Sequence, residues 1–362
     1  MMFSAADHDF MAQAVRLAER GLTSTTPNPR VGCVIVNAGV IVGEGWHQRA
    51  GDAHAEIHAL QSAGEQARGA TAYVTLEPCS HYGRTPPCAQ ALIDAGIARV
   101  VAAMKDPNPL VAGQGLAMLA TAGISTQCGL LESAAQELNI GFVSRMTRGR
   151  PWVRLKVAAS LDGKTALQNG SSQWITSAAA RQDGHRWRAR ACAILSGIGT
   201  VRDDDPQLNV RGVDVSRQPL KVVVDSRLEL PLAAKVFSGG GLLLASASED
   251  ANKSAALREQ GAEVIRLPNA EGKVDLPALM QELGRRGINE LHVEGGFRLN
   301  GALLAAGLVD ELLLYLAPCL VGDAARGMFD LPALTSLEDK RSLNIRDMRM
   351  VGQDLRVLAR FS

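Results

Sequence analysis

At 362 residues the chain is long enough for about two domains of ordinary size, each with its own core. Hydrophobic residues make up 46% of it and charged residues 21%, as in an ordinary globular protein. A formal net charge of +1 excludes the strongly basic surface that binds a nucleic-acid backbone, so we expect a small-molecule partner and neither nucleic acid nor a membrane. The first twenty residues lack a signal-peptide pattern and the six cysteines do not resemble a disulfide framework, which together predict a cytoplasmic protein.

Helix-like and strand-like segments alternate along the first part of the chain. The predicted elements are, in chain order, a helix over 7–20, a hairpin over 31–46, a helix from about 52, a strand over 71–76, a helix over 87–96, a strand over 99–104 and a helix over 133–146. This alternation predicts an α/β sheet that is covered by helices on both faces.

A linker is predicted at 145–151, RMTRGRP, because it combines arginines, glycine and proline with no apolar periodicity. We therefore expect two domains, over 1–146 and 151–362. The second is also predicted to be α/β, with strands over 152–160, 191–197, 220–226, 241–247, 262–267, 290–296 and 311–322, and helices over 177–190, from 275 and over 298–307.

The stretch HAEIHAL, residues 54–60, places a glutamate two positions after a histidine. In the middle of a helix Glu56 would point about 200° away from His54, so the two side chains can serve one site only from a helix end. A helix that begins at Asp52 places both of them in its first turn. His58, one turn further along, is better explained as a hydrogen-bonded residue of the core.

Two cysteines occur in the polar, proline-rich stretch EPCSHYGRTPPC, residues 77–88. Thr85 followed by two prolines predicts a helix start, which places Cys88 at a helix N-terminus, where the helix dipole favours the thiolate. One histidine and two cysteines leave the fourth position of a zinc ion open for water, as catalytic zinc sites do. We predict that His54, Cys79 and Cys88 hold one zinc ion per chain.

Glu56 is not a predicted ligand and is therefore free to move protons during hydrolysis. The pattern H-x-E with P-C-x-x-C is the general signature of zinc nucleobase deaminases, although eight residues separate Cys79 from Cys88 here instead of two. Two alternatives stay open. His81 as a fourth ligand would close the site, and a zinc-stabilised binding module would have no turnover.

The second part of the chain lacks the G-x-G-x-x-G pattern of a Rossmann unit, since neither GIGTVR nor VEGGFRLNG has its spacing. The stretch ELHVEGGFRLNGALLAAG, residues 290–307, predicts a strand, a glycine pair and a helix whose first N–H groups are free to bind a phosphate. A plain turn between strand and helix explains the same pattern.

Motifs over nearly the whole chain carry a resemblance to known proteins. The first 150 residues resemble the cytidine-deaminase superfamily, and the full chain is similar to the bifunctional deaminase–reductase family of riboflavin biosynthesis. The motifs are TPNPRVGCVIV, GWHQRAGDAHAEIHAL, TAYVTLEPCSHYGRTPPC, KDPNPLVAGQG, SLDGKTA, SQWITS, DDPQLNVR and VEGG. The long cysteine spacing agrees with this family better than with cytidine or tRNA deaminases.

The resemblance implies a fold and a reaction. The fold is a cytidine-deaminase-like three-layer α/β domain followed by a dihydrofolate-reductase-like α/β domain, in a chain that we expect to form a homo-oligomer. The reaction is zinc-assisted loss of the amino group at ring carbon 2 of a phosphoribosylated diaminopyrimidine, followed by NADPH-dependent reduction of the ribose to a ribityl chain. A nucleoside or tRNA deaminase fused to an unrelated nucleotide-binding domain is the alternative.

The resemblance also assigns site residues, while three positions have reasons of their own. Asn28, in TPNPR, is a candidate for reading the pyrimidine edge, although an asparagine between prolines also suits a turn. A phosphate monoester pairs best with arginine, which favours the family positions Arg188 and Arg211. Lys156 lies beside the sugar in the family and is our candidate proton donor for the reduction. The family positions for the cofactor are Ala158, Trp174, Thr200, Asp204, Ser226, Gly296, Phe297, Arg298, Leu299, Asn300, Gly301 and Ala302, and those for the substrate are Ser172, Arg188, Leu208, Arg211 and Glu294.

Overall fold

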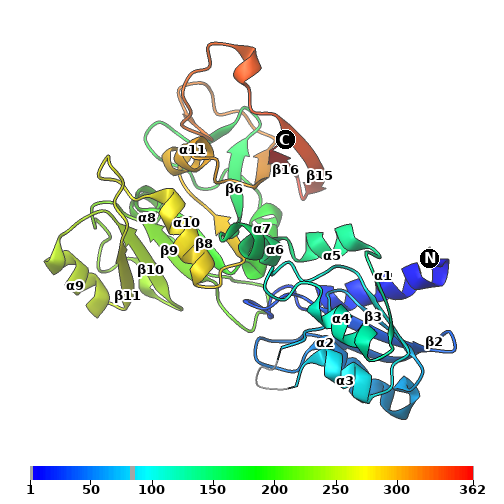
Figure 1. Cartoon of the computed structure of the whole chain (residues 1–362). Coiled ribbons are helices and arrows are strands. Elements are labelled where there is room, and N and C mark those ends of the chain that lie inside the picture. Colours follow the sequence, from blue (N-terminus) through cyan, green and yellow to red (C-terminus); the bar gives the residue numbers. More distant parts are fainter. Residues whose placement is uncertain (1–2, 82–85, 362) are drawn as a thin grey trace. The chain divides into compact units, whose positions relative to one another are not determined.

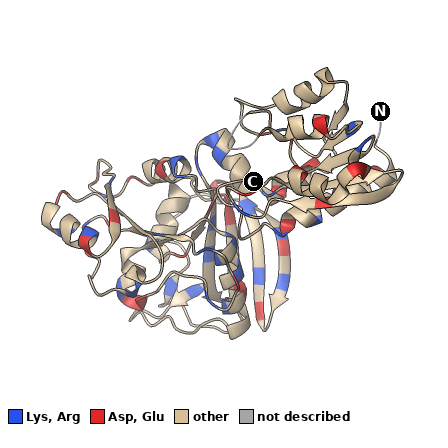
Figure 2. Cartoon of the chain, turned by 90° about the horizontal axis from the view of Figure 1, so that it is seen from below, with Lys and Arg blue, Asp and Glu red and all other residues tan. Residues whose placement is uncertain are grey.

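The computed structural model describes residues 3–81 and 86–361, and the chain divides into two compact units, Met1–Gly149 and Arg150–Ser362 (Figure 1). Each unit is built around its own β-sheet. Acidic and basic positions are interspersed over both units rather than gathered by sign (Figure 2). Within the described residues, no helix combines the length and apolar character needed to cross a bilayer.

The first unit holds a five-stranded mixed sheet between two layers of helices. Its elements are α1 (Ala5–Glu19), β1 (Gly32–Asn37), β2 (Val40–Trp46), α2 (Ala55–Ala63), β3 (Thr71–Val74), α3 (Cys88–Asp94), β4 (Arg99–Ala102), α4 (Gln114–Thr121), β5 (Ser125–Cys128), α5 (Glu132–Leu138) and α6 (Ile140–Arg148). The strand order is β2-β1-β3-β4-β5, with β1 antiparallel to both neighbours and β3, β4 and β5 parallel. Helix α1 covers one face and α2, with α3 beside it, covers the other, which confirms the predicted three layers (Figure 1).

Helix α2 lies directly on the backbone of β2. A Cβ atom added at Gly43 would stand 2.3 Å from the Ala59 carbonyl oxygen, and one added at Gly45 would stand 2.3 Å from that of Ala55. Real Cβ atoms do not approach an oxygen so closely, so only glycine permits this packing. The start of α2, which carries His54 and Glu56, is thereby held at a fixed height above the sheet.

Two predictions for this unit need correction, and a third is not tested. Helix α2 begins at Ala55 instead of Asp52, because the preceding chain is a turn closed by a hydrogen bond from Asp52 N to the Arg49 carbonyl, and His54 is extended as the N-cap residue. The helix expected over 133–146 is two helices, since the buried Asn139 side chain bonds the backbone of Arg30 on both sides and interrupts the helix. The predicted cap Thr85 lies outside the described residues.

The second unit is a nine-stranded sheet with helices on both faces. Its elements are β6 (Trp152–Ser160), β7 (Lys164–Ala166), α7 (Ala178–Arg190), β8 (Ala193–Gly197), α8 (Ile198–Asp204), β9 (Leu220–Val224), β10 (Leu242–Ser246), α9 (Ala251–Glu259), β11 (Ala262–Arg266), α10 (Leu276–Arg285), β12 (Glu290–Val293), α11 (Phe297–Ala305), β13 (Glu311–Ala317), β14 (Arg326–Gly327), β15 (Leu343–Val351) and β16 (Asp354–Phe361). The order is β11-β10-β9-β8-β12-β6-β13-β16-β15, and only the pairs that involve β16 are antiparallel. The sheet is α/β as predicted, whereas helices α8 and α9 and the terminal hairpin β15–β16 were not foreseen.

Helix α7 packs on the sheet through a layer of charged side chains, beside a small apolar cluster that joins Ala180 and Trp187 to Leu313 of β13. Arg154, which is 2% exposed, pairs with Glu290 at 3.1 Å and with Glu311 at 2.5 Å. From α7, Arg190 reaches Glu290 at 2.7 Å, and Asp183 accepts a 2.6 Å hydrogen bond from the hydroxyl of Tyr315. Because such bonds are directional, they fix the rotation of α7 and hence the direction of the side chains on its other face.

Candidate active sites

In the first unit, His54, Cys79 and Cys88 come together between the ends of α2, β3 and α3. Their ligand atoms all lie within 4.8 Å of one another. The Nδ1 atom of His54 is 3.2 Å from Cys88 Sγ and 3.7 Å from Cys79 Sγ. His81 is exposed and does not belong to this group, so the cluster among the described residues has three members and not four.

These donors fit a zinc ion. Bond lengths of about 2.3 Å for sulfur and 2.0 Å for nitrogen give ligand separations of roughly 3.5 Å in a tetrahedron, close to the two distances from His54. The thiol of Cys79 also has a pKa below that of a free cysteine, because the Cys88 side chain and the Cys88 backbone N–H, 3.3 Å away, hydrogen bond to it. A thiolate is the form that binds zinc, so Cys79 is the readier ligand of the pair, whereas the same contact and burial raise the pKa of Cys88.

Glu56 is buried beside this cluster, with 3% of its surface exposed. Burial raises the pKa of its carboxyl to about 7, against the opposing charge of His54. A carboxyl whose pKa lies near neutrality can both accept and return a proton under physiological conditions. The structure thus places beside the three donors a group that is suited to general acid–base chemistry.

A second carboxylate, Glu77, holds the backbone just before Cys79 in place. It was not predicted as a functional residue. Its two oxygens accept hydrogen bonds of 2.9–3.2 Å from the backbone N–H groups of Asp106, Gly113, Gly115 and Leu116. The side chain thereby joins the end of β3 to the segment that leads into α4. The only sequence signal for this role was the position of Glu77 directly before Pro78 and Cys79.

Asn28 is connected to the metal cluster by His47, a histidine that was not predicted as a site residue. The Nδ2 atom of Asn28 is 3.1 Å from His47 Nε2, and His47 Nδ1 is 3.1 Å from the carbonyl oxygen of Ala53. The ring of His47 stands perpendicular to that of His54, with 5.4 Å between the ring centroids. Because its Nδ2 faces His47, Asn28 has its Oδ1 available to accept a hydrogen bond from another molecule.

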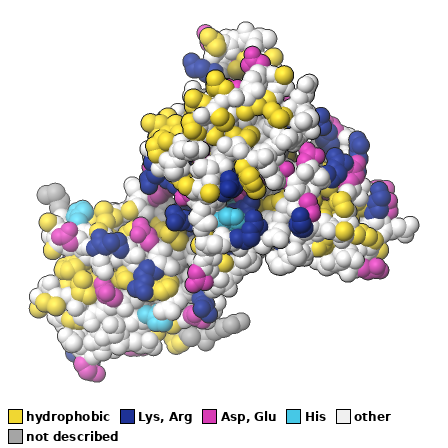
Figure 3. All heavy atoms as spheres, turned by 180° about the vertical axis from the view of Figure 1, so that it is seen from behind, with side chains coloured by type: hydrophobic (Ala, Val, Ile, Leu, Met, Phe, Trp, Pro, Cys, Tyr) yellow, Lys and Arg dark blue, Asp and Glu magenta, His cyan; other side chains and the backbone are white. Residues whose placement is uncertain are grey.

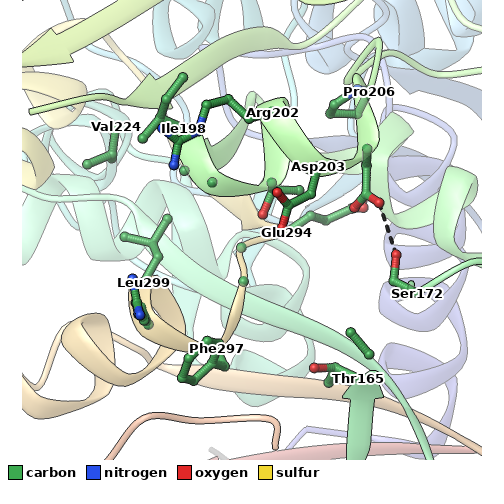
Figure 4. Close-up of a pocket in the computed structure, with 18 of the residues that line it drawn as sticks. Thr165, Ser172, Ile198, Arg202, Asp203, Pro206, Val224, Glu294, Phe297 and Leu299 are labelled. Carbon is green, nitrogen blue, oxygen red and sulfur yellow. Dashed lines mark hydrogen bonds between the residues drawn. The ribbon is translucent and has the colours of Figure 1, made fainter. Parts of the chain in front are cut away.

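The second unit contains a cavity of about 1690 Å³ at the carboxyl ends of the parallel strands (Figure 4). The volume exceeds the 300–1000 Å³ that one drug-sized ligand fills, so there is room for two. The residues predicted for the cofactor and substrate in this unit line it, except Asn300, which is buried behind the wall with its Nδ2 bonded to the Met328 carbonyl. Inside the cavity Ser172 donates a 2.9 Å hydrogen bond to Asp204 (Figure 4).

A cluster of charged groups occupies one side of this cavity. Arg188 holds Glu294 with two hydrogen bonds, of 2.6 and 2.8 Å. Although burial acts in the opposite direction, Arg188 and Lys156 keep the pKa of Glu294 well below its usual range. Burial in turn lowers the pKa of Lys156, with Glu294 opposing the shift. An ammonium with a lowered pKa gives up its proton more readily than an exposed lysine.

The other side of the cavity fits a dinucleotide. Helix α11 begins at Phe297 with Gly296 as its N-cap and no capping side chain, so its first N–H groups face the cavity and can bind a diphosphate. Ile198, Val224 and Leu299 form an apolar group near this helix, as expected for a slot that takes a flat ring (Figure 4). The glycine pair before α11 therefore leads into a helix N-terminus, as the sequence pattern predicted.

Comparisons with known proteins identify the family of the chain. A family model described as the cytidine and deoxycytidylate deaminase zinc-binding region matches residues 4–104, and one described as the RibD C-terminal domain matches residues 151–354. The riboflavin biosynthesis protein RibD of Escherichia coli is 50% identical over 96% of this chain and 98% of its own, and that of Haemophilus influenzae is 47% identical over 98% and 97%. A solved structure of RibD from Acinetobacter baumannii matches with a TM-score of 0.92 at 44% identity, and a deaminase/reductase from Thermotoga maritima with 0.88 at 32%, each over 99% of both chains.

Proposed function

Because this chain belongs to the RibD family of riboflavin biosynthesis proteins, we propose that residues 1–146 deaminate a phosphoribosylated diaminopyrimidine and that residues 151–362 then reduce its sugar. The chain is a bifunctional enzyme, a zinc-dependent deaminase and an NADPH-dependent reductase. The first substrate is 2,5-diamino-6-ribosylamino-4(3H)-pyrimidinone 5′-phosphate, and the final product carries a ribityl side chain. The cluster of His54, Cys79 and Cys88 beside the buried Glu56 is the observation that carries the deaminase assignment.

In the deaminase site each chain residue has a separate task. A zinc ion held by the three ligands supplies, when bound, an acidified water as the nucleophile. Glu56 accepts one proton from the attacking water and delivers it to a ring nitrogen. It then takes the proton of the hydroxyl group that has added to the ring carbon and passes it to the amino group, which leaves as ammonia while the carbonyl forms. Asn28 reads the pyrimidine edge, and its free Oδ1 suits the amino and N–H groups of a diaminopyrimidine.

In the reductase site the chain holds the sugar and its phosphate against the cofactor. NADPH supplies a hydride when bound, with its diphosphate at the start of α11. Arg188 and Arg211 bind the 5′-phosphate of the substrate, together with Ser172 and Leu208. Lys156, whose pKa burial lowers, donates the proton that accompanies the hydride, and Glu294 keeps that ammonium in place by its charge.

An order-of-addition experiment tests the proposal as a whole. With the diaminopyrimidine phosphate as substrate, we expect one ammonia per molecule and NADPH oxidation that starts only after ammonia has been released. Supplying the deaminated compound directly should abolish this lag, which a coupled absorbance assay would resolve. Ammonia release from free cytidine or from tRNA, with none from the diaminopyrimidine, would instead favour the alternative deaminases.

We also propose that the enzyme acts in the cytoplasm on free small molecules and not on nucleic acid. None of the six cysteines, all of which lie among the described residues, forms a disulfide, as is usual in a reducing compartment. In the view of Figure 2 the acidic and basic positions of the described residues alternate along the elements, whereas a phosphate backbone is bound by clustered Lys and Arg. These features support the small-molecule assignment without identifying a compartment by themselves.

The terminal hairpin supports our proposal of a homo-oligomer. Strand β15 is the edge of the nine-stranded sheet, and Leu343, Ile345, Met348 and Met350 on it are 41–61% exposed. Hydrophobic side chains gather at the end of the molecule where the C-terminal segments lie (Figure 3). An exposed apolar edge strand is costly in a monomer and is usually covered. We therefore place a second copy of the chain against β15.

Charged substitutions on β15 should reduce the size of the particle in solution. We expect Ile345→Lys combined with Met348→Lys to shift the molar mass, measured by light scattering after gel filtration, to that of one chain of 38.3 kDa. Leu320→Lys is a matched control, because Leu320 is 77% exposed outside the strand. An unchanged oligomer in the β15 variant would place the interface elsewhere.

A further inference from the structure

Helix α7 holds the segment 207–212 at three points along one side of the cavity. Gln182 Nε2 donates to the Gly212 carbonyl at 2.5 Å, and Arg188 donates to the Asn209 carbonyl at 2.8 Å. Between them the backbone N–H of Arg211 donates to His185 Nδ1 at 3.2 Å. The segment carries Leu208 and Arg211, both proposed substrate residues, so α7 determines where those two side chains stand.

This contact fixes the protonation of His185 by geometry. A backbone N–H can only donate, so Nδ1 must be the bare nitrogen of the ring and the proton must be on Nε2. Burial, with the charges of Arg188 and Arg211, lowers the pKa of His185 to about 4, which agrees with an uncharged ring. His185 lines the cavity, and no described residue accepts a hydrogen bond from its Nε2.

The neighbouring arginines leave room for another donor. Arg188 already spends its Nε and one terminal nitrogen on Glu294, and its other terminal nitrogen donates to Asn209. Arg211 donates to the side-chain oxygens of Asn209 and Gln207 at 2.5 and 3.2 Å. Five N–H groups therefore remain on the two guanidinium groups. Each of the three terminal oxygens of a phosphate dianion accepts about two or three hydrogen bonds, so the dianion can take a further donor beside these five.

We propose that His185 is a further substrate-binding residue of the reductase, which donates from Nε2 to the 5′-phosphate and holds the Arg211 segment through Nδ1. The inference rests on the proposed function, in which Arg188 and Arg211 bind that phosphate. It adds a neutral donor between two cations. His185 thus contributes a hydrogen bond to the anion without adding a third positive charge that would repel its neighbours in the empty site.

Two substitutions separate the hydrogen bonds from the volume of the ring. His185→Leu keeps a similar bulk but can neither accept nor donate, whereas His185→Gln retains an acceptor for Arg211 and a donor for the phosphate. We expect His185→Leu to raise the KM for the deaminated phosphosugar about 10- to 100-fold, as for the loss of a hydrogen bond to a charged group. With the same substrate lacking its phosphate, the change should be less than about 2-fold, and His185→Gln should stay within about 3-fold of the wild type on both.

A binding measurement provides a readout that does not depend on turnover. Calorimetric titration with ribose 5-phosphate and with ribose should show that His185→Leu loses affinity for the phosphorylated sugar alone. An equal loss on both sugars, a fall in kcat with unchanged KM, or a failure of His185→Gln to restore binding in a folded protein would overturn the role of His185. If the wild type itself does not prefer the phosphorylated sugar, the phosphate site of the proposed function fails instead.

Discussion

Replacing Glu56 by Gln is expected to slow ammonia release about 100- to 10,000-fold while the zinc content stays at one ion per chain. Glutamine keeps the shape and burial of the side chain but cannot accept the proton of the attacking water. Because Glu56 is not one of the three predicted ligands, the metal should remain. Turnover with the diaminopyrimidine phosphate and elemental analysis of the same sample measure the two quantities together.

The control for this variant is Glu65→Gln, since Glu65 is an exposed glutamate in the same unit. NADPH oxidation with the already deaminated substrate should be unchanged in both variants. A Glu56→Gln enzyme that deaminates at the wild-type rate would eliminate Glu56 as the proton carrier and would favour a binding module. Loss of zinc together with activity would mean that Glu56 supports the ligands and not the chemistry.

The same substitution has a consequence for stability in chelator-treated protein. Burial raises the pKa of Glu56 from 4.5 to about 7, so the folded state binds a proton more tightly than the unfolded state. The free energy of unfolding should therefore fall as the pH rises from about 4.5 to 7, by on the order of 3 kcal/mol, and stay low above that range. Glutamine does not titrate, so the Glu56→Gln protein should lack this decline in urea unfolding followed at several pH values.

Replacing Arg188 by Ala is expected to lower kcat/KM for the reduction about 100- to 1000-fold. The variant removes a cation from the proposed phosphate site and two hydrogen bonds from Glu294. It also leaves Glu294, whose side chain is 16% exposed, without its partner, which should destabilise the second unit by roughly 3 kcal/mol. Steady-state kinetics and thermal unfolding of the same preparation would separate the two effects.

A double variant distinguishes the structural from the binding part of the Arg188 effect. Adding Glu294→Gln to Arg188→Ala removes the unpaired charge, so stability should recover while phosphate binding stays weak. Arg186→Ala is the control, because Arg186 is exposed on the same helix. Recovery of substrate affinity along with stability would mean that Arg188 only supports the fold.

The metal site was predictable because its signals are local. His54 and Glu56 are two residues apart, and Cys79 and Cys88 are nine residues apart in a proline-rich stretch that ends where α3 begins. Motif spacing and the predicted helix starts were therefore enough to group these residues without knowledge of the whole fold. The same holds for the glycine pair before α11. In each case the chemistry depends on where one helix or strand begins or ends, and the residue pattern at such an end is visible in the sequence.

What the sequence did not reveal depends on contacts between distant segments. His47 and His185 gain their roles from Asn28 and from the Arg211 backbone, and neither partner is implied by periodicity. The charged layer under α7 joins Arg154 to Glu290 and Glu311, which lie 136 and 157 residues further along the chain. In strands β6, β12 and β13 these residues resemble ordinary surface positions, and only the sheet order shows that they face one another.

The contact of α2 with Gly43 and Gly45 implies that deaminase activity is sensitive to substitutions at positions that take no part in the chemistry. Both glycines lie on β2 and outside the group of proposed site residues, yet a methyl group at either position would collide with the backbone of α2 and shift the helix start that carries His54 and Glu56. If every residue is substituted in turn and deaminase activity is measured, inactive variants should therefore also appear at Gly43 and Gly45 on β2, the edge strand of the first unit's sheet. Those substitutions would map to two residues that carry no side chain, and a search limited to reactive side chains would overlook them.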